Sequence, residues 1–312
     1  RPLRGGDFTM KRLLCLLSAL LLLALPLASC SDGGDEAGEG LQIVATNFPL
    51  YDFASRVAGE NASVKLLLTP GAEPHGYEPS PSDMKAILGC DLFLYIGGES
   101  DAWVETLLET SEDIDSLKLI DSVEPLQEED EEHNYDEHIW TDPQNAVRMT
   151  EAIAAALCAV DGAHRDGYES RRDAFVAELS ALDEDFADVV ERLGIRTIVF
   201  GDRFPVVYFT HRYGIEAFAA FPGCSHETEP AARTMSMLTD KVRDEQIGTV
   251  FYVELSNHAV ADAIAADTGA VTAMLHSCSN VTKEEFDRGV TYLSLMRQNL
   301  RTLEEAYAHA GD

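Results

Sequence analysis

Basic side chains are scarce in this sequence. Its 312 residues include 23 Lys and Arg against 55 Asp and Glu, which gives a formal net charge of −32. Proteins that bind nucleic acid need a basic surface to neutralise phosphates, so this composition argues against nucleic acid as a partner. The excess of carboxylates favours solubility and attracts cations instead.

Long apolar runs are also missing, since the longest, residues 13–25, falls short of the roughly 20 residues that a membrane-spanning helix needs. This run follows Met10 and two basic residues and is followed by small residues, which predicts a secretory signal over residues 1–29. We interpret residues 1–9 as lying upstream of the native start. An exported protein is therefore expected.

The signal ends in Leu27-Ala28-Ser29-Cys30, which resembles a bacterial lipobox. We expect Cys30 to be lipidated and to anchor the chain on the outer face of the cell membrane, in the periplasm if the cell has two membranes. An ordinary cleaved signal with an incidental cysteine is the alternative. Residues 30–40 contain no large apolar side chain and predict a flexible tether.

Signatures of common catalytic sites are absent. The sequence contains no His-Glu-x-x-His pattern, no Gly-x-Ser-x-Gly pattern and no glycine-rich phosphate loop. A metal-dependent hydrolase, the main alternative from another functional class, would need an open coordination position and a general base. We therefore expect no enzyme.

Only six cysteines are present. Cys90 and Cys158 lie in apolar runs and are expected to be buried thiols. Cys224 and Cys278 lie in loop-like segments, and in an exported protein they could form a disulfide. Sequence alone does not determine connectivity, so two separate thiols remain the alternative.

Short apolar runs alternate with helical patterns in two blocks, which predicts α/β lobes with parallel sheets. We assign residues 41–163 to an N-terminal lobe and residues 195–312 to a C-terminal lobe, joined by one long rigid helix within residues 164–194. We also expect a single long helix over residues 283–308, starting at a capping box of Thr282 and Glu285. The expected strands cover residues 41–46, 64–68, 91–96, 117–120, 196–200, 248–253 and 270–275.

Two histidines occupy comparable strand-to-helix loops. His75 lies in a Pro/Gly-rich loop before a helix capped by Ser80, and His138 lies just before the helix that starts at Pro143. Ligands of open α/β sheets bind at the carboxyl ends of the strands, where such loops meet. Neutral imidazole is the commonest transition-metal ligand, so the pair indicates a metal site.

The segments Pro74-His75-Gly76-Tyr77-Glu78-Pro79-Ser80-Pro81-Ser82-Asp83 and His138-Ile139-Trp140-Thr141-Asp142-Pro143 carry a family resemblance. They resemble the zinc/manganese-binding solute-binding lipoproteins of ABC importers, the cluster A-I family, on its zinc-uptake branch. The resemblance covers nearly the whole chain after the tether. It implies a monomer that holds one metal ion in the cleft between its lobes, with His75 and His138 as first-lobe ligands, and delivers the ion to a permease.

The second-lobe ligands follow the family pattern less closely. The resemblance places Arg203 where a His or Glu ligand is expected, and an arginine offers no lone pair. Asp202 is our first choice for the third ligand, with His226, Glu227 and Glu254 as alternatives. A structural ion pair between Asp202 and Arg203 is the competing interpretation.

The resemblance also implies a ligand after a late strand, and His276 takes that place. Cys278 is an alternative thiolate ligand that competes with the disulfide. Three imidazoles and one oxygen favour Zn²⁺, whereas Mn²⁺ prefers carboxylates and water. We therefore expect Zn²⁺, with Mn²⁺ as the alternative metal and an adhesin or sensor as an alternative use of the same fold.

An acidic run, residues 128–137, precedes His138. In zinc members of the family a longer, His-rich acidic loop lies here and collects ions. A solvated charged surface is the simpler interpretation of a run with a single additional histidine, His133.

Overall fold

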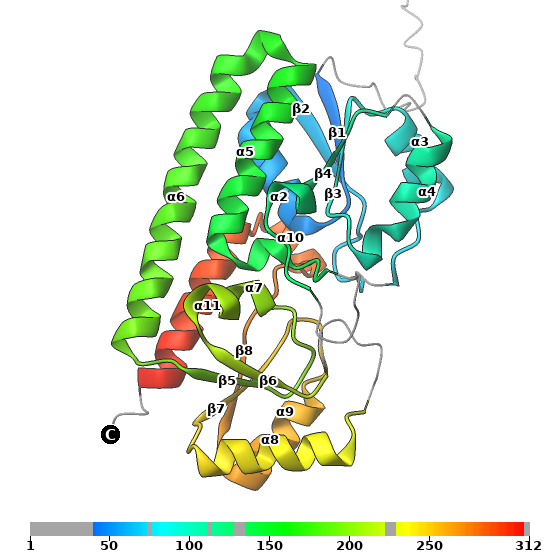
Figure 1. The fold of residues 1–312 in the computed structure, drawn as a ribbon. Coiled ribbons are helices and arrows are strands. Elements are labelled where there is room, and N and C mark those ends of the chain that lie inside the picture. The colour runs from blue at the N-terminus through cyan, green and yellow to red at the C-terminus, as the bar shows by residue number, and fades with distance from the viewer. Residues whose placement is uncertain (1–39, 74–75, 112–113, 128–134, 222–228, 309–312) are drawn as a thin grey trace, which may run out of the picture. The chain divides into compact units, whose positions relative to one another are not determined.

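Two parallel four-stranded sheets form the framework of the protein (Figure 1). The computed structural model describes residues 40–73, 76–111, 114–127, 135–221 and 229–308. The predicted signal, lipobox and tether up to residue 39 lie outside these residues. No helix in the described ranges is long and apolar enough to cross a membrane.

The N-terminal sheet has the strand order β2-β1-β3-β4. All of its neighbouring strands are parallel, and Ile43 of β1 pairs with both Val64 of β2 and Leu92 of β3. The strands are β1 (Leu41–Ala45), β2 (Ala62–Leu66), β3 (Leu92–Tyr95) and β4 (Ser116–Lys118). The strand order reverses direction between β1 and β3, so a crevice for a ligand is expected at the carboxyl ends of these two strands.

The C-terminal sheet repeats this topology in the order β6-β5-β7-β8. Its strands are β5 (Thr197–Phe200), β6 (Glu216–Ala219), β7 (Thr249–Tyr252) and β8 (Val271–Met274). The reversal lies between β5 and β7. The expected α/β fold with two parallel sheets is confirmed, although the short strand β6 was not predicted.

Helices cover both faces of each sheet because successive strand residues are apolar on both sides. In β3, Leu94 faces α2 (Phe48–Ala58), α5 (Pro143–Val160) and α6 (Arg165–Arg192), whereas Phe93 faces α3 (Pro81–Leu88) and α4 (Ala102–Thr110). In β5, Phe200 joins the first of these cores. Val199 packs toward α8 (Ala232–Asp244) and α9 (Ala259–Thr268). Each lobe is therefore a three-layer sandwich.

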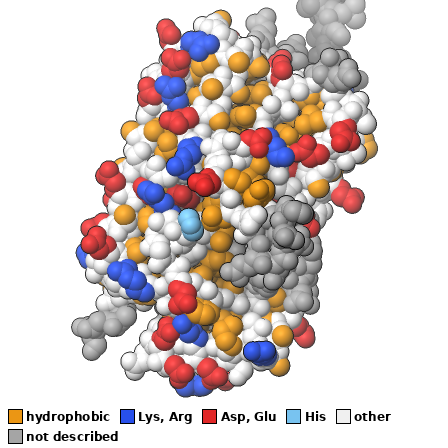
Figure 2. Space-filling view, viewed as in Figure 1, with side chains coloured by type: hydrophobic (Ala, Val, Ile, Leu, Met, Phe, Trp, Pro, Cys, Tyr) orange, Lys and Arg blue, Asp and Glu red, His pale blue; other side chains and the backbone are white. Residues whose placement is uncertain are grey.

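The long helix α6 joins the two lobes, as expected. With 28 residues it extends about 42 Å at 1.5 Å per residue. The side chains predicted from the 3.6-residue period are all buried, and its outer face carries charged side chains (Figure 2). These buried residues are Tyr168, Phe175, Leu179, Leu182, Phe186 and Val190.

The prediction of a single terminal helix over residues 283–308 is wrong. The chain forms α10 (Lys283–Asp287) and then α11 (Tyr292–Ala308). Gly289 ends the first helix with a φ of 70°, and Val290 donates its N–H to Glu285 O at 3.0 Å. The second helix starts where the amide of Tyr292 donates to the carboxylate of Asp52, 240 residues away. A tertiary contact therefore fixes the break.

Candidate metal site

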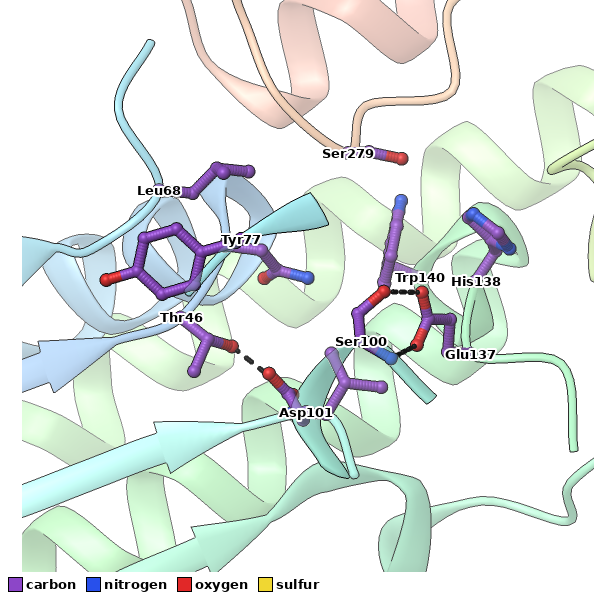
Figure 3. Close-up of a pocket in the computed structure, with 11 residues that line it drawn as sticks. Thr46, Leu68, Tyr77, Ser100, Asp101, Glu137, His138, Trp140 and Ser279 are labelled. Carbon is purple, nitrogen blue, oxygen red and sulfur yellow. Dashed lines mark hydrogen bonds between the residues drawn. The ribbon is translucent and has the colours of Figure 1, made fainter. Parts of the chain in front are cut away.

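A small cavity of about 30 Å³ lies at the reversal point of the N-terminal sheet. Thr46 follows β1 and Ile96 follows β3, so both line it from the carboxyl ends of their strands. His138 and Trp140 line it from the loop before α5, and Ser279 contributes from the C-terminal lobe (Figure 3). The volume is comparable to that of one water molecule or a small ion. Both lobes therefore enclose one site.

His138 is held in a defined orientation within this cavity. The residue is 1% exposed. The Oδ1 atom of Asp136 accepts the backbone N–H of His138 at 2.8 Å and lies 3.1 Å from its Nδ1 atom. A carboxylate can only accept, so this contact places the neutral ring's proton on Nδ1. The lone pair then resides on Nε2, which is the arrangement of a metal-binding histidine with an outer carboxylate.

Trp140 ties the loop of His138 to the second lobe. Its indole N–H donates to Ser277 O at 2.8 Å, and its own carbonyl accepts the hydroxyl of Tyr292 at 2.6 Å. Asp142 then caps α5 by accepting the amide of Gln144 at 2.8 Å. These hydrogen bonds hold the loop between His138 and α5 against the second lobe and against the start of α5.

Two buried carboxylates surround the same cavity. Asp101 accepts the amides of Ile96 at 2.7 Å and Gly97 at 3.2 Å, and burial raises its pKa to about 6 although these amides lower it. Glu137 accepts both the amide and the hydroxyl of Ser100 (Figure 3). Closely spaced carboxylates in a buried cavity favour a cation.

His276 lines a different cavity from His138. It lies beside Thr141, Met296 and Asn299, and its Nδ1 accepts the amide of Cys278 at 2.9 Å. Its buried Nε2 makes no hydrogen bond within the part of the chain that the structure describes. An Nδ1 atom that accepts an N–H leaves the proton of a neutral ring on Nε2. Metal binding through Nε2 would therefore require a tautomer change, which Glu254, 3.5 Å from Nδ1, would favour.

Asp202 follows β5 at the reversal point of the C-terminal sheet. Its oxygens accept the amides of Arg203 at 2.8 Å and Val253 at 3.3 Å, which leaves lone pairs for a further partner. The guanidinium group of Arg203 pairs with Glu73 of the other lobe at 3.0 Å. The alternative of a side-chain ion pair between Asp202 and Arg203 is therefore wrong.

Glu254 accepts hydrogen bonds from the loop after β8. Its carboxylate accepts the amide of Ser277 at 2.7 Å and also the Ser277 hydroxyl, as Glu137 does with Ser100. Cys278 is fully buried in this loop, and burial raises the pKa of its thiol. A high pKa disfavours the thiolate that a metal requires.

Several predicted site residues lie outside the described residues, namely Cys30, His75, Cys224, His226 and Glu227. The proposed ligand set and the disulfide of Cys224 with Cys278 therefore stay predictions. Among the residues that the structure describes, no three His, Cys, Asp or Glu gather into a metal-binding group.

Asp136 and Ser279 were not predicted as site residues from the sequence. Asp136 belongs to the acidic run 128–137, whose charge masked the signal of a carboxylate two positions before a histidine. Ser279 enters the cavity only because the loop after β8 crosses to the first lobe, where Phe48 donates its amide to Ser279 O at 3.4 Å. No local sequence pattern indicates that contact.

Proteins of similar sequence are named for metal binding or metal uptake. The chain is 29% identical over 316 residues to "Zinc-binding lipoprotein AdcA" of Streptococcus pneumoniae, with 97% of this chain and 62% of that protein covered. It is 27% identical over 306 residues to "High-affinity zinc uptake system protein ZnuA" of Bacillus subtilis, covering 92% and 94%. A "Manganese-binding lipoprotein MntA" of Halalkalibacterium halodurans is 29% identical over 295 residues, covering 92% and 96%.

A solved structure has the same fold. The Zn(II)-bound ZnuA-like domain of Streptococcus pneumoniae AdcA superposes with a TM-score of 0.75 at 28% identity, covering 86% of this chain and 99% of that one. The chain spans 62% of the full pneumococcal protein, and its match covers 99% of the ZnuA-like domain. The model of the family "Zinc-uptake complex component A periplasmic" matches residues 43–306, and the chain belongs to this family.

Proposed function

We propose that the protein captures Zn²⁺ outside the cytoplasm, in the cavity between its lobes, and delivers the ion to the permease of an ABC importer. The observation that carries this proposal is the buried pair of His138 and Asp136 in a cavity that both lobes enclose. The relatives named for zinc binding and zinc uptake support it.

In this proposal His75 and His138 bind the ion from the first lobe. His276 and Asp202 are the proposed ligands of the second lobe, with His226, Glu227 and Glu254 as alternatives, although His276 lines a cavity separate from that of His138. Glu254 already holds Ser277 through both oxygens, which favours an outer role for it. Imidazole-rich sites prefer Zn²⁺, whereas the manganese-binding relative makes Mn²⁺ the competing metal.

A lipid anchor at Cys30 would keep the capture domain beside its permease. The relatives named as lipoproteins support this arrangement. Cys30→Ser should release the protein from the membrane fraction into the soluble fraction without changing its metal affinity. Retention of the variant on the membrane would contradict the anchor.

Metal binding tests the central proposal. The affinity of the mature chain for Zn²⁺ is measured by competition with a chromogenic chelator, and the titration is repeated with Mn²⁺. His75→Ala combined with His138→Ala should abolish tight binding. His211→Ala, which removes an exposed histidine of α7 (Val207–Tyr213), should leave it unchanged.

Three outcomes would overturn the proposal. Wild-type protein that binds no more Zn²⁺ than the double variant has no site at these histidines. Tighter binding of Mn²⁺ than of Zn²⁺ would instead assign the protein to manganese capture. Metal-dependent turnover of ester or amide substrates would favour a hydrolase.

A further inference from the structure

The loop after β2 is held against the second lobe by the side chain of Asn280 and by one backbone hydrogen bond. The amide nitrogen of Asn280 donates to Thr69 O at 2.9 Å and to Ala72 O at 2.8 Å, across 211 and 208 residues of sequence. The amide of Gly71 donates back to Val281 O at 2.7 Å. Three hydrogen bonds therefore hold this turn of the first lobe on the second lobe.

The side chain of Asn280 is committed to this contact. It is 1% exposed, and its Oδ1 accepts the amide of Val281 at 2.9 Å. A flipped amide would point its oxygen at two carbonyl oxygens, so the orientation is determined. Movement of the turn would leave the buried side-chain nitrogen of Asn280 without its two acceptors, which is unfavourable.

Both partners of this contact adjoin the cavity of His138. Leu68, directly before the turn, and Ser279, directly before Asn280, each line that cavity. Ala72 lies three positions before His75 in the sequence. Arg203 adds its ion pair with Glu73 at the same junction, where it is partly exposed and therefore weak. The contact of Asn280 thus sets the spacing between two walls of the cavity.

We propose that Asn280 is a positioning residue for metal capture, which holds the turn 69–72 at the spacing that tight binding needs. This inference rests on the proposed function. Asn280 does not touch the ion; it removes the freedom of the loop before the ion arrives, so that binding orders less of the chain. Residues that orient the ligands of a metal typically contribute 10- to 100-fold to its affinity.

Asn280→Ala tests the proposal through Zn²⁺ affinity, measured by chelator competition. We expect affinity to fall by about 10- to 100-fold. The visible absorption spectrum of the Co²⁺-loaded protein should also change, because it reports ligand geometry and a merely structural role would not move it. Asn280→Asp retains the side-chain shape but replaces both donors by an acceptor, so it should weaken binding as well.

Arg171→Met is the matched control. Arg171 also donates to two backbone carbonyls, Val57 O at 2.7 Å and Ala58 O at 2.8 Å, but none of these residues lines the cavity. The control should lower the thermal unfolding temperature of the apoprotein while leaving Zn²⁺ affinity and the Co²⁺ spectrum unchanged.

Unchanged Zn²⁺ affinity in folded Asn280→Ala would overturn the proposal while leaving zinc capture intact. An equal loss of affinity in Arg171→Met would also overturn it, since the loss would then reflect stability. If Asn280→Ala does not fold, Gly71→Ala provides the test from the first lobe, because Gly71 has a φ of 86° that alanine adopts only with strain. Wild-type protein without Zn²⁺ binding would refute the proposed function itself.

Discussion

Three described histidines, His138, His164 and His258, contact an aspartate through Nδ1, and their surroundings differ. His138 and Asp136 are almost fully buried beside the cavity, at 3.1 Å. His258 and Asp262 make the same contact at 2.9 Å on the surface, where both side chains are about half exposed. Water competes with the exposed pair, whereas the buried aspartate fixes both the ring and its tautomer.

Asp136→Ala should therefore lower Zn²⁺ affinity by about 10- to 100-fold, because His138 loses the carboxylate that orients it. Asp262→Ala removes the same kind of contact from His258 and should leave the affinity unchanged. Isothermal titration of both variants provides the comparison. Equal affinities in Asp136→Ala and wild type would show that the buried pair has no part in binding.

The sequence predicts single residues of the site better than their partners. His138 was identifiable because it precedes the start of α5, whose cap and proline are local signals. Asn280 carries no such signal, since its partners lie more than 200 positions away. His276 occupies the expected place after β8, yet the neighbouring amide of Cys278 gives its ring a tautomer that sequence cannot indicate.

At the scale of elements, local capping determined which boundaries were predictable. The helix that was expected to be capped by Ser80 is α3, because Ser80 and Asp83 form a complete capping box within four residues. The split between α10 and α11 was not predictable, because Asp52 of α2 caps α11 through a tertiary contact. Strand β6 was missed because it is short, begins with Glu216 and lies at the edge of its sheet.

The contact of α2 with α11 should make stability depend on pH. Burial raises the pKa of Asp52 to about 6 from 3.8, although Arg56 and the amide of Tyr292 lower it. The folded state therefore favours the protonated carboxyl, so this group stabilises the fold at low pH and less as pH rises through 6.

Asp52→Asn keeps an acceptor for Tyr292 and removes the titration. Relative to this variant, wild-type protein should lose about 2 kcal/mol of unfolding free energy between pH 4.5 and 7.5. Urea unfolding at both pH values measures the difference. Parallel pH profiles of the two proteins would contradict the raised pKa of Asp52.

At the scale of residues 40–312, one apolar core extends through both lobes. It includes Leu94 of the first sheet, Phe200 of the second, and residues along α5, α6 and α11. Separate lobes joined only by a hinge would each have a closed core. The continuous core makes large opening motions costly and favours a site whose geometry is set before the ion binds.

This core predicts that residues 40–312 unfold in one transition. Differential scanning calorimetry should give a calorimetric enthalpy equal to the van't Hoff enthalpy, and Zn²⁺ should raise the transition temperature without splitting it. Two separated transitions in the metal-free protein would show that the lobes are independent.

The charge of the whole molecule should govern the rate of metal capture. Acidic side chains exceed basic ones by 32, while many charges on α6 are paired locally, such as Arg165 with Glu169 and Arg192 with Asp188. The unpaired excess creates a negative potential that attracts divalent cations over a Debye length of about 30 Å at 0.01 M salt and about 3 Å at 1 M.

Stopped-flow association of Zn²⁺ should therefore slow by at least about tenfold between these salt concentrations. The dissociation rate depends on contacts within the buried site and should change little. An association rate independent of ionic strength would mean that the acidic surface does not steer the ion.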